Sequence, residues 1–241
     1  MAELTGFPDG KRKAVTFGFD DGEQHDRRLA ALFRQYGLKA TFFLITGQFG
    51  LEIPFHRYGA DTVVRRVVEN ELPETYRGME VASHTETHRA PIGTLREAVR
   101  DSMDRLETLS GMPVTGMAYP GGEFTGDHLL ELEGLGVDYA RTTQYTHAFA
   151  LPPRLLAWAP TCRYCDREMD CLLDAFLQPA QQPQLFYIMG HSYELEQSDP
   201  HADWAYMETI CRRLAGREDI WYATNGEIAA HLLSTRQAVR R

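Results

Sequence analysis

Short apolar runs alternate along this chain with stretches whose apolar residues recur at helical spacing. Leu29, Leu32, Phe33 and Tyr36 would share one helix face, and Gly37 would end that helix. We expect strands at residues 14–19, 40–45, 79–83, 114–119, 139–143, 185–189 and 220–223. We expect helices at residues 26–36, 61–71, 94–109, 127–135, 168–177 and 203–214, and a last one after residue 224.

Strand–helix alternation of this kind predicts an α/β fold with a parallel sheet. Such a sheet is either open and doubly wound or closed into a barrel. No glycine-rich phosphate loop follows the first strand, which disfavours a nucleotide-binding open fold. Residues 144–163 form a proline-rich segment that is too long for a plain connector.

Polar side chains follow five of the predicted strands at the point where each strand ends. They are Asp20 and Asp21, His84 and His88, Tyr119 to Gly122, Arg141, and His191. In an α/β barrel the C-terminal ends of all strands meet on one face, where active sites are built. We therefore expect these groups to share one site.

Each of these groups also has an ordinary structural explanation. The two aspartates could form a turn with Gly22, His84 and His88 could be solvated loop residues, and His191 could be a core histidine. Their joint occurrence at strand ends favours function. Two imidazoles and a carboxylate suit a divalent transition metal, a second carboxylate can act as general base, and an opposed histidine as general acid. This set predicts metal-assisted hydrolysis of an amide or an ester.

The composition is that of a globular protein, with 43% hydrophobic and 24% charged residues among 241. The net charge of −9 disfavours nucleic acid and anionic membranes as partners. No apolar run reaches the ~20 residues of a membrane span. Because residues 1–13 hold no apolar signal segment, we expect a cytoplasmic protein. Nothing in the sequence points to one oligomeric state.

Four cysteines are present, and Cys162 and Cys165 have CxxC spacing. A zinc knuckle needs a second ligand pair, and the sequence has no other CxxC. Cys171 and a histidine could complete a site, but we expect free thiols.

Several motifs resemble those of the polysaccharide deacetylases, the NodB-homology fold of carbohydrate esterase family four. Phe17-Gly18-Phe19-Asp20-Asp21-Gly22 is similar to their first motif, and His84-Thr85-Glu86-Thr87-His88 to their second. Pro120-Gly121-Gly122 stands in the place of the third, and Tyr187-Ile188-Met189-Gly190-His191 resembles the last. The order and spacing hold over residues 13–225.

The resemblance implies a distorted (β/α)7 barrel and a single NodB-type domain over residues 1–241. It makes Asp20 the catalytic base and His191 the general acid. It implies a divalent metal, with zinc as the expected ion, held by Asp21, His84 and His88.

The third motif carries a further implication for the reaction. The backbone N–H of Gly121 would help to hold the oxyanion. We expect Tyr119, Pro120 and Glu194 beside the substrate.

Two positions depart from the family pattern. The arginine that tethers the base, two residues before the proline of the third motif, is replaced by Ala118. Arg141 either substitutes for it as part of the catalytic set or is a structural arginine. The aspartate that orients the acid histidine is usually followed closely by tryptophan; Asp138 lies in that region, but no tryptophan follows it. These departures indicate a subgroup with an altered substrate.

We expect a metal-dependent hydrolase that removes N-acetyl groups from an amino sugar or a glycan. Three alternatives stay open: hydrolysis of another non-peptide C–N bond, as in a cyclic amide or small acylated amine; an O-acetyl esterase; and a non-catalytic carbohydrate-binding protein. In a barrel, residues 144–163 would rise over the active-site face. We therefore expect a pocket that prefers a small soluble amino sugar or a short oligosaccharide.

Overall fold

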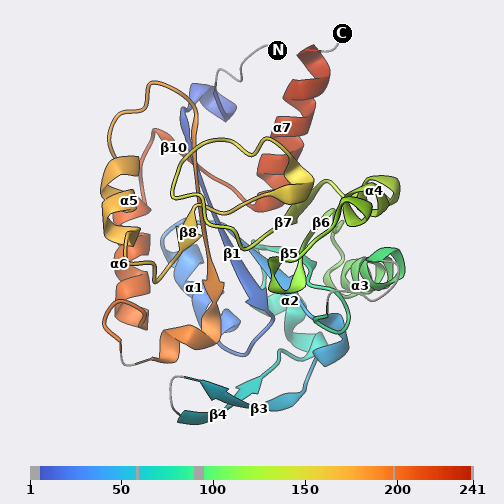
Figure 1. Cartoon of the computed structure of the whole chain (residues 1–241). Helices are drawn as coiled ribbons and strands as arrows, with labels where there is room; N and C mark the ends of the chain where they lie inside the picture. The colour runs from blue at the N-terminus through green and yellow to red at the C-terminus, as the bar shows by residue number, and fades with distance from the viewer. Residues whose placement is uncertain (1–5, 58–59, 90–94, 198, 240–241) are drawn as a thin grey trace.

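The computed structural model describes residues 6–57, 60–89, 95–197 and 199–239 (Figure 1). Within these ranges, eight parallel strands form one curled sheet in the order β7-β6-β5-β2-β1-β9-β8, with β10 also paired to β1. The strands are β1 (Lys13–Asp21), β2 (Ala40–Leu44), β5 (Glu80–Ser83), β6 (Gly116–Ala118), β7 (Tyr139–Arg141), β8 (Cys162–Arg163), β9 (Gln184–His191) and β10 (Ile220–Tyr222). The curled parallel sheet confirms the predicted α/β fold of the distorted barrel type.

Most helices pack against the outer face of this curled sheet. The helices are α1 (Asp26–Gln35), α2 (Leu72–Thr75), α3 (Leu95–Ser110), α4 (Gly126–Leu135), α5 (Met169–Phe176), α6 (Trp204–Leu214) and α7 (Asn225–Val239). Helices α5 and α6 lie on one side of the molecule, and α3 and α4 lie on the opposite side (Figure 1). No helix in the described part of the chain is long and apolar enough to cross a membrane.

Side-chain alternation along the strands decides which groups reach the barrel interior. On β1, Val15, Phe17 and Phe19 pack into the core cluster that contains Leu29 and Phe33 of α1. Ala14 belongs to a second cluster, the interior cluster, which contains residues from several strands of the sheet. Asp20, an even position like Ala14, therefore ends β1 on the interior side.

The same alternation applies to the neighbouring strands. Leu185 and Tyr187 of β9 and Tyr139 of β7 belong to the interior cluster. His191 and Arg141 stand at even spacing from these residues, so both also point inward at their strand ends. In the register of the sheet, His191 is the direct neighbour of Asp20.

The proline-rich segment joins the two edges of the sheet, and its middle part does not rise over the active-site face as expected. Trp158 pairs with Arg141 at the β7 edge, and β8 pairs with β9 at the other edge. The middle of the segment runs toward the start of β9, where Leu185 N–H donates to Phe149 O. A large apolar side chain such as Phe149 is stabilised there by packing against the ring of Phe186.

Residues 61–71 are not the helix that we expected. Strands β3 (Glu52–Arg57) and β4 (Ala60–Arg65) form an antiparallel hairpin instead, followed by a short 3₁₀ turn at Glu69–Glu71. Val64 is buried while Val63 is exposed, which is the alternation of a strand. The hairpin lies beyond the C-terminal end of β1 (Figure 1), and Val67 N–H donates to Gly22 O at its base.

All four cysteines are free thiols, as predicted. Cys162 and Cys211 are buried. No cysteine within the described ranges belongs to a cluster that could hold a metal ion.

Candidate active site

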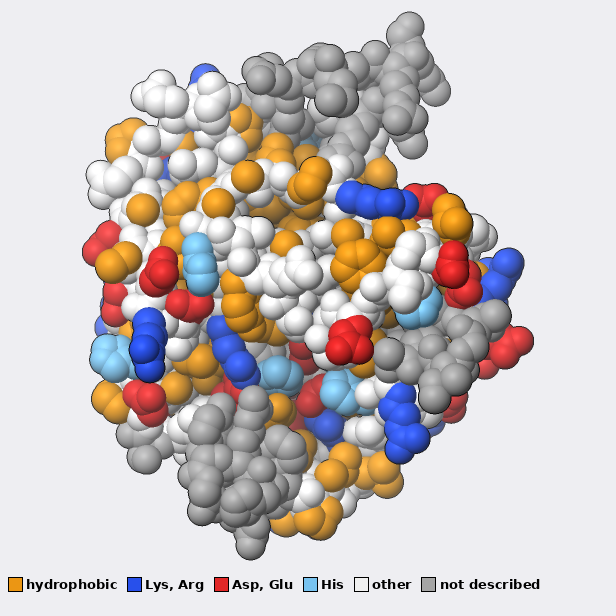
Figure 2. Space-filling view, viewed as in Figure 1, with side chains coloured by type: hydrophobic (Ala, Val, Ile, Leu, Met, Phe, Trp, Pro, Cys, Tyr) orange, Lys and Arg blue, Asp and Glu red, His pale blue; other side chains and the backbone are white. Residues whose placement is uncertain are grey.

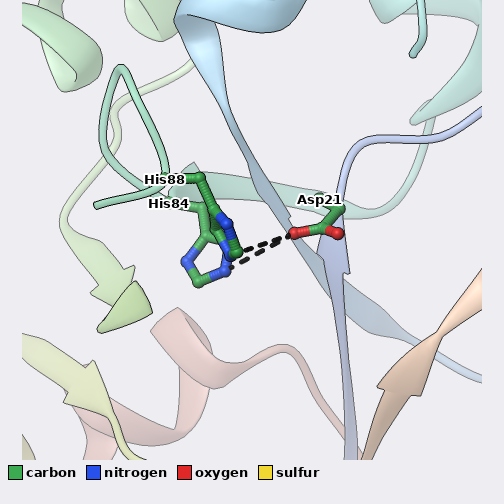
Figure 3. Close-up of side chains that lie close together, drawn as sticks. All are labelled: Asp21, His84 and His88. Carbon is green, nitrogen blue, oxygen red and sulfur yellow. Dashed lines mark ion pairs between the residues drawn. The ribbon is translucent and has the colours of Figure 1, made fainter. Parts of the chain in front are cut away.

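The three predicted metal ligands converge at the C-terminal ends of β1 and β5 (Figure 3). The ligand atoms of Asp21, His84 and His88 all lie within 4.8 Å of one another. Asp21 Oδ1 is 3.7 Å from His84 Nε2 and 3.5 Å from His88 Nε2. In the described part of the chain, this is the one cluster of at least three His, Cys, Asp or Glu side chains with such spacing.

The donor set fits a divalent metal. Metal–ligand bonds of ~2.0–2.2 Å place neighbouring tetrahedral donor atoms roughly 3.3–3.6 Å apart, which is close to the separations here. His84 Nδ1 lies 2.9 Å from Ala118 O. An N–H donated to this carbonyl leaves the Nε2 lone pair directed at Asp21. Asp21 Oδ1 is buried and accepts no hydrogen bond from the protein, as expected for an atom reserved for a cation.

Electrostatics favour the ligating protonation states of these groups. Burial lowers the pKa of His84, although Asp20 and Asp21 oppose this effect. Burial alone would raise the pKa of Asp21, but His191, His84 and Arg66 outweigh it and hold this pKa below its ordinary value. A neutral imidazole and an ionised carboxylate are the forms that bind a metal.

The backbone is strained at this cluster. Asp21, Thr85 and His88 have φ values of 83°, 63° and 56°, in the left-handed region that non-glycine residues rarely adopt. The turn at Asp21 ends the alternation of β1, so the adjacent Asp20 and Asp21 side chains both face the same site. Such strain is typical of functional sites, where the surrounding structure over-determines the conformation.

Asp20 is held by Arg141 in a buried ion pair. Arg141 Nη2 lies 2.6 Å from Oδ1 and 2.5 Å from Oδ2 of Asp20, and both side chains are at most 4% exposed. Burial alone would lower the pKa of Arg141, but the Asp20 carboxylate outweighs it and the pKa is raised. Arg141 thus contacts the carboxylate that the arginine missing at Ala118 would have tethered.

His191 lies on the other side of Asp20, with its Nε2 3.9 Å from Asp20 Oδ2. Burial lowers the pKa of His191 to about 4, against the attraction of Asp20 and Asp21. The ring is therefore neutral at neutral pH. Figure 2 shows histidine and acidic side chains gathered on this face and bordered by Lys and Arg side chains.

The residues of the third motif occupy different environments. Tyr119 is 1% exposed and its hydroxyl donates to Leu156 O, so this side chain is part of the core. Pro120 is also buried and begins a 3₁₀ turn, in which Gly121 has a φ of 65°. Gly121 and Gly122 line an open cavity of about 520 Å³ together with Phe124, Thr143 and other residues. Of the three expected substrate contacts, Gly121 is the exposed one.

Glu194 does not fit the expected substrate contact. Its carboxylate is fully buried and pairs with both Nε and Nη2 of Arg163. Burial and pairing remove this group from the surface that a substrate could touch.

Sequence reasoning missed two arginines at the site. Arg66 Nη1 lies 3.3 Å from Asp21 Oδ2, and Arg163 pairs with Glu194. Arg163 ends β8, but no strand was expected there, so it lacked the strand-end signal that marked the other site residues. Arg66 had no such signal, because residues 61–71 were expected to be helical.

Sequence reasoning also missed a buried cluster of polar side chains around Asp26, next to Ser192. Asp26 accepts hydrogen bonds from Ser192 Oγ at 2.5 Å, Tyr76 Oη at 2.7 Å and Glu23 N at 3.1 Å. The side chain of Glu23 also pairs with His25 Nδ1 at 2.6 Å. This cluster joins the turn after β1 to the residue that follows His191.

Comparison with known proteins points to one family. The family model described as polysaccharide deacetylase matches residues 8–140, which is more than half of the chain. No curated protein matches the chain.

Solved structures share the fold at low sequence identity. A candidate polysaccharide deacetylase from Mycobacterium smegmatis is 18% identical, with 98% of this chain and 95% of that chain covered and a TM-score of 0.61. A family 4 acetyl xylan esterase from Clostridium thermocellum, solved with a cobalt ion, is 16% identical over 90% and 91% of the two chains, with a TM-score of 0.53.

Some other matches are partial. A polysaccharide deacetylase from Bacillus cereus is 22% identical with a TM-score of 0.45, and the match covers 54% of this chain but 40% of that one. The matched family model spans both the β1 aspartates and the His84–His88 pair. The chain belongs to the polysaccharide deacetylase family.

Proposed function

We propose that this protein is a metal-dependent hydrolase that removes N-acetyl groups from an amino sugar or a glycan. The observation that carries the proposal is the joint geometry of one cluster. A potential metal triad, Asp21 with His84 and His88, lies beside an arginine-held carboxylate, Asp20, and a buried histidine, His191. A carbohydrate-binding protein has no need for base, metal ligands and acid in one place.

A divalent metal bound by the triad would lower the pKa of a water and polarise the acetyl carbonyl. Zinc is the expected ion, and the cobalt in the acetyl xylan esterase from Clostridium thermocellum supports a divalent metal in this fold. Asp20 would accept a proton from the attacking water, since its carboxylate reaches within 4.0 Å of His84 Nε2. Arg141 fixes the direction of that carboxylate through its two contacts with Nη2.

His191 would deliver a proton to the leaving nitrogen. Its neutral ring lies 3.9 Å from Asp20 Oδ2, so the proton that Asp20 removes from water can reach Nε2 and then the amine. The backbone N–H of Gly121 would donate to the oxyanion, because the exposed Gly121 lines the cavity next to the C-terminal end of β6.

The same groups could cleave an O-acetyl ester, and the esterase among the similar structures makes this the second candidate. A better leaving group needs less help from His191. Hydrolysis of a cyclic amide or a small acylated amine uses the same chemistry. The expected preference for small substrates depended on residues 144–163 covering the active-site face. Because the middle of this segment runs along the barrel wall, we no longer expect that preference.

The test is acetate release after chelation and after return of Zn²⁺ or Co²⁺. N-acetylated monosaccharides, chitin oligomers and polymer, O-acetylated xylan and a cyclic amide form the panel, with Asp20→Asn as the inactive control. Metal-restored acetate release from N-acetylated sugars, absent in the control, is the expected result. Bound metal with no turnover on the whole panel would favour a binding protein instead.

A further inference from the structure

The pair formed by Glu194 and Arg163 touches His191 on the edge of the ring that faces away from Asp20. Glu194 lies in the 3₁₀ turn Ser192–Glu196 directly after β9, and Arg163 is the last residue of β8. Arg163 Nε donates to Glu194 Oε2 at 3.2 Å, and Nη2 donates to Oε1. This two-pronged contact holds a fully buried carboxylate in one orientation.

Both members of the pair reach the same ring nitrogen. Glu194 Oε1 and Arg163 Nη2 each lie 3.4 Å from His191 Nδ1. Glu194 Oε2 also accepts the backbone N–H of His191 at 3.4 Å. The opposite nitrogen, Nε2, faces Asp20. One edge of the imidazole is therefore next to a donor and an acceptor, while the other edge faces the reacting groups.

We propose that Glu194 and Arg163 are the positioning pair of His191. Nδ1–H donates to Glu194 in both the neutral and the charged ring, and Arg163 holds the Glu194 carboxylate in place. The ring can then gain and lose a proton at Nε2 without turning. A histidine that must cycle between both forms needs such a neighbourhood, because which nitrogen carries the proton is set by the partner of the other nitrogen.

Residues 144–163, which join the two sheet edges, then contribute directly to the site. Strand β8 is two residues long and pairs with β9 through Cys162 and Arg163. The segment that joins the β7 edge to β9 thus delivers the guanidinium that holds Glu194. The proposal rests on the acid role assigned to His191 above, but the pair's effect on the ring can be measured without any substrate.

The charged and titratable groups around His191 come from several elements. They are Asp20 and Asp21 of β1, Arg141 of β7, Arg163 of β8, and Tyr193 and Glu194 of the following turn. Glu194 and Arg163 carry opposite charges and each lies 3.4 Å from Nδ1, so changes at the pair should act on the ring in opposite directions. Loss of the Glu194 charge should lower the pKa of His191, and loss of the Arg163 charge should raise it.

The experiment compares Glu194→Gln, Arg163→Met, the double variant, and Glu196→Gln as matched control. Glu196 belongs to the same turn but its side chain is 51% exposed. The pKa and tautomer of His191 are read by NMR on histidine-labelled metal-free protein, with the signal assigned from His191→Ala. We expect a lower pKa in Glu194→Gln, a higher one in Arg163→Met, non-additivity in the double variant, and no change in Glu196→Gln.

Activity gives a second readout. In the metal-loaded enzyme, Glu194→Gln should lower kcat about 10–100-fold with KM nearly unchanged, the size typical for loss of a partner behind a catalytic group. If Arg163 instead contacts substrate, Arg163→Met would raise KM and leave the His191 pKa unchanged, which would overturn the proposal.

Two further outcomes separate the proposals. A His191 tautomer and pKa in Glu194→Gln equal to those of Glu196→Gln would overturn the positioning pair, even if the enzyme is a deacetylase. A shifted His191 in a protein inactive on every substrate would support the pair and overturn the proposed function. If Glu194→Gln does not fold, Arg163→Met against Arg163→Lys decides: the pKa should rise in the first and stay near wild type in the second.

Discussion

Asp26 should make the stability of this protein depend on pH. Burial raises the pKa of Asp26 from 3.8 to about 7, although hydrogen bonds from Ser192 and Tyr76 oppose the shift, and the neighbouring Glu23 adds to it. A proton on the Asp26 oxygen that faces Ser192 Oγ would be donated to that hydroxyl. Asparagine at this position can reproduce the protonated form, with its amide nitrogen toward Ser192 and its oxygen toward Tyr76.

The size of the effect follows from linkage. A shift of about 3 pKa units corresponds to about 4 kcal/mol, because each unit is worth ~1.4 kcal/mol. The folded-state pKa is raised, so the folded protein holds the proton more tightly than the unfolded chain does. The stabilisation of the folded protein by the proton on Asp26 is fully present below pH ~4 and is lost as pH rises through ~7. Between pH 5 and 8.5 this loss is roughly 2–3 kcal/mol.

Urea unfolding of metal-free protein across this range measures the effect. Wild type should lose roughly 2–3 kcal/mol more unfolding free energy than Asp26→Asn between pH 5 and 8.5. Asp174→Asn is the control, since that carboxylate is 72% exposed on an outer helix, and its curve should follow wild type. Parallel curves for wild type and Asp26→Asn would refute the reasoning, because they would mean that Asp26 does not bind its proton more tightly in the folded state.

Three further predictions concern the site itself. Asp21→Asn and His84→Ala should each sharply lower metal content by elemental analysis, since two remaining ligands cannot close the site; wild-type metal content in both would exclude this cluster. Asp20→Asn should keep its metal but lose about 10²–10⁴-fold in kcat, the usual worth of a general base, and a near-normal kcat would identify another base. Arg141→Met should lower kcat by up to about 10²-fold, because the contact that fixes the direction of the Asp20 carboxylate is gone; a near-normal kcat would leave Arg141 with a structural role alone.

Much of the site could be predicted from local patterns. Strand–helix alternation indicated the parallel sheet, and the polar residues at strand ends indicated where chemistry gathers. The two-residue repeat of a strand places Asp20 and His191 on the same inner face without any knowledge of the fold. The sequence also placed Arg141 at a predicted strand end. Its buried ion pair with Asp20, however, joins residues 121 positions apart.

The tertiary structure alone decided which distant residues and segments pair with one another. Residues 61–71 carry valines that suit a helix face or a strand, and their pairing with residues 52–57 made them a hairpin that delivers Arg66. The proline-rich segment has no regular period, so its path was set by the two open sheet edges that it joins. Glu194 was expected beside the substrate, but it is buried and paired with Arg163, 31 positions away. Local periodicity indicates which face of an element is buried, whereas the pairing of distant charges depends on which strand ends the curled sheet brings together.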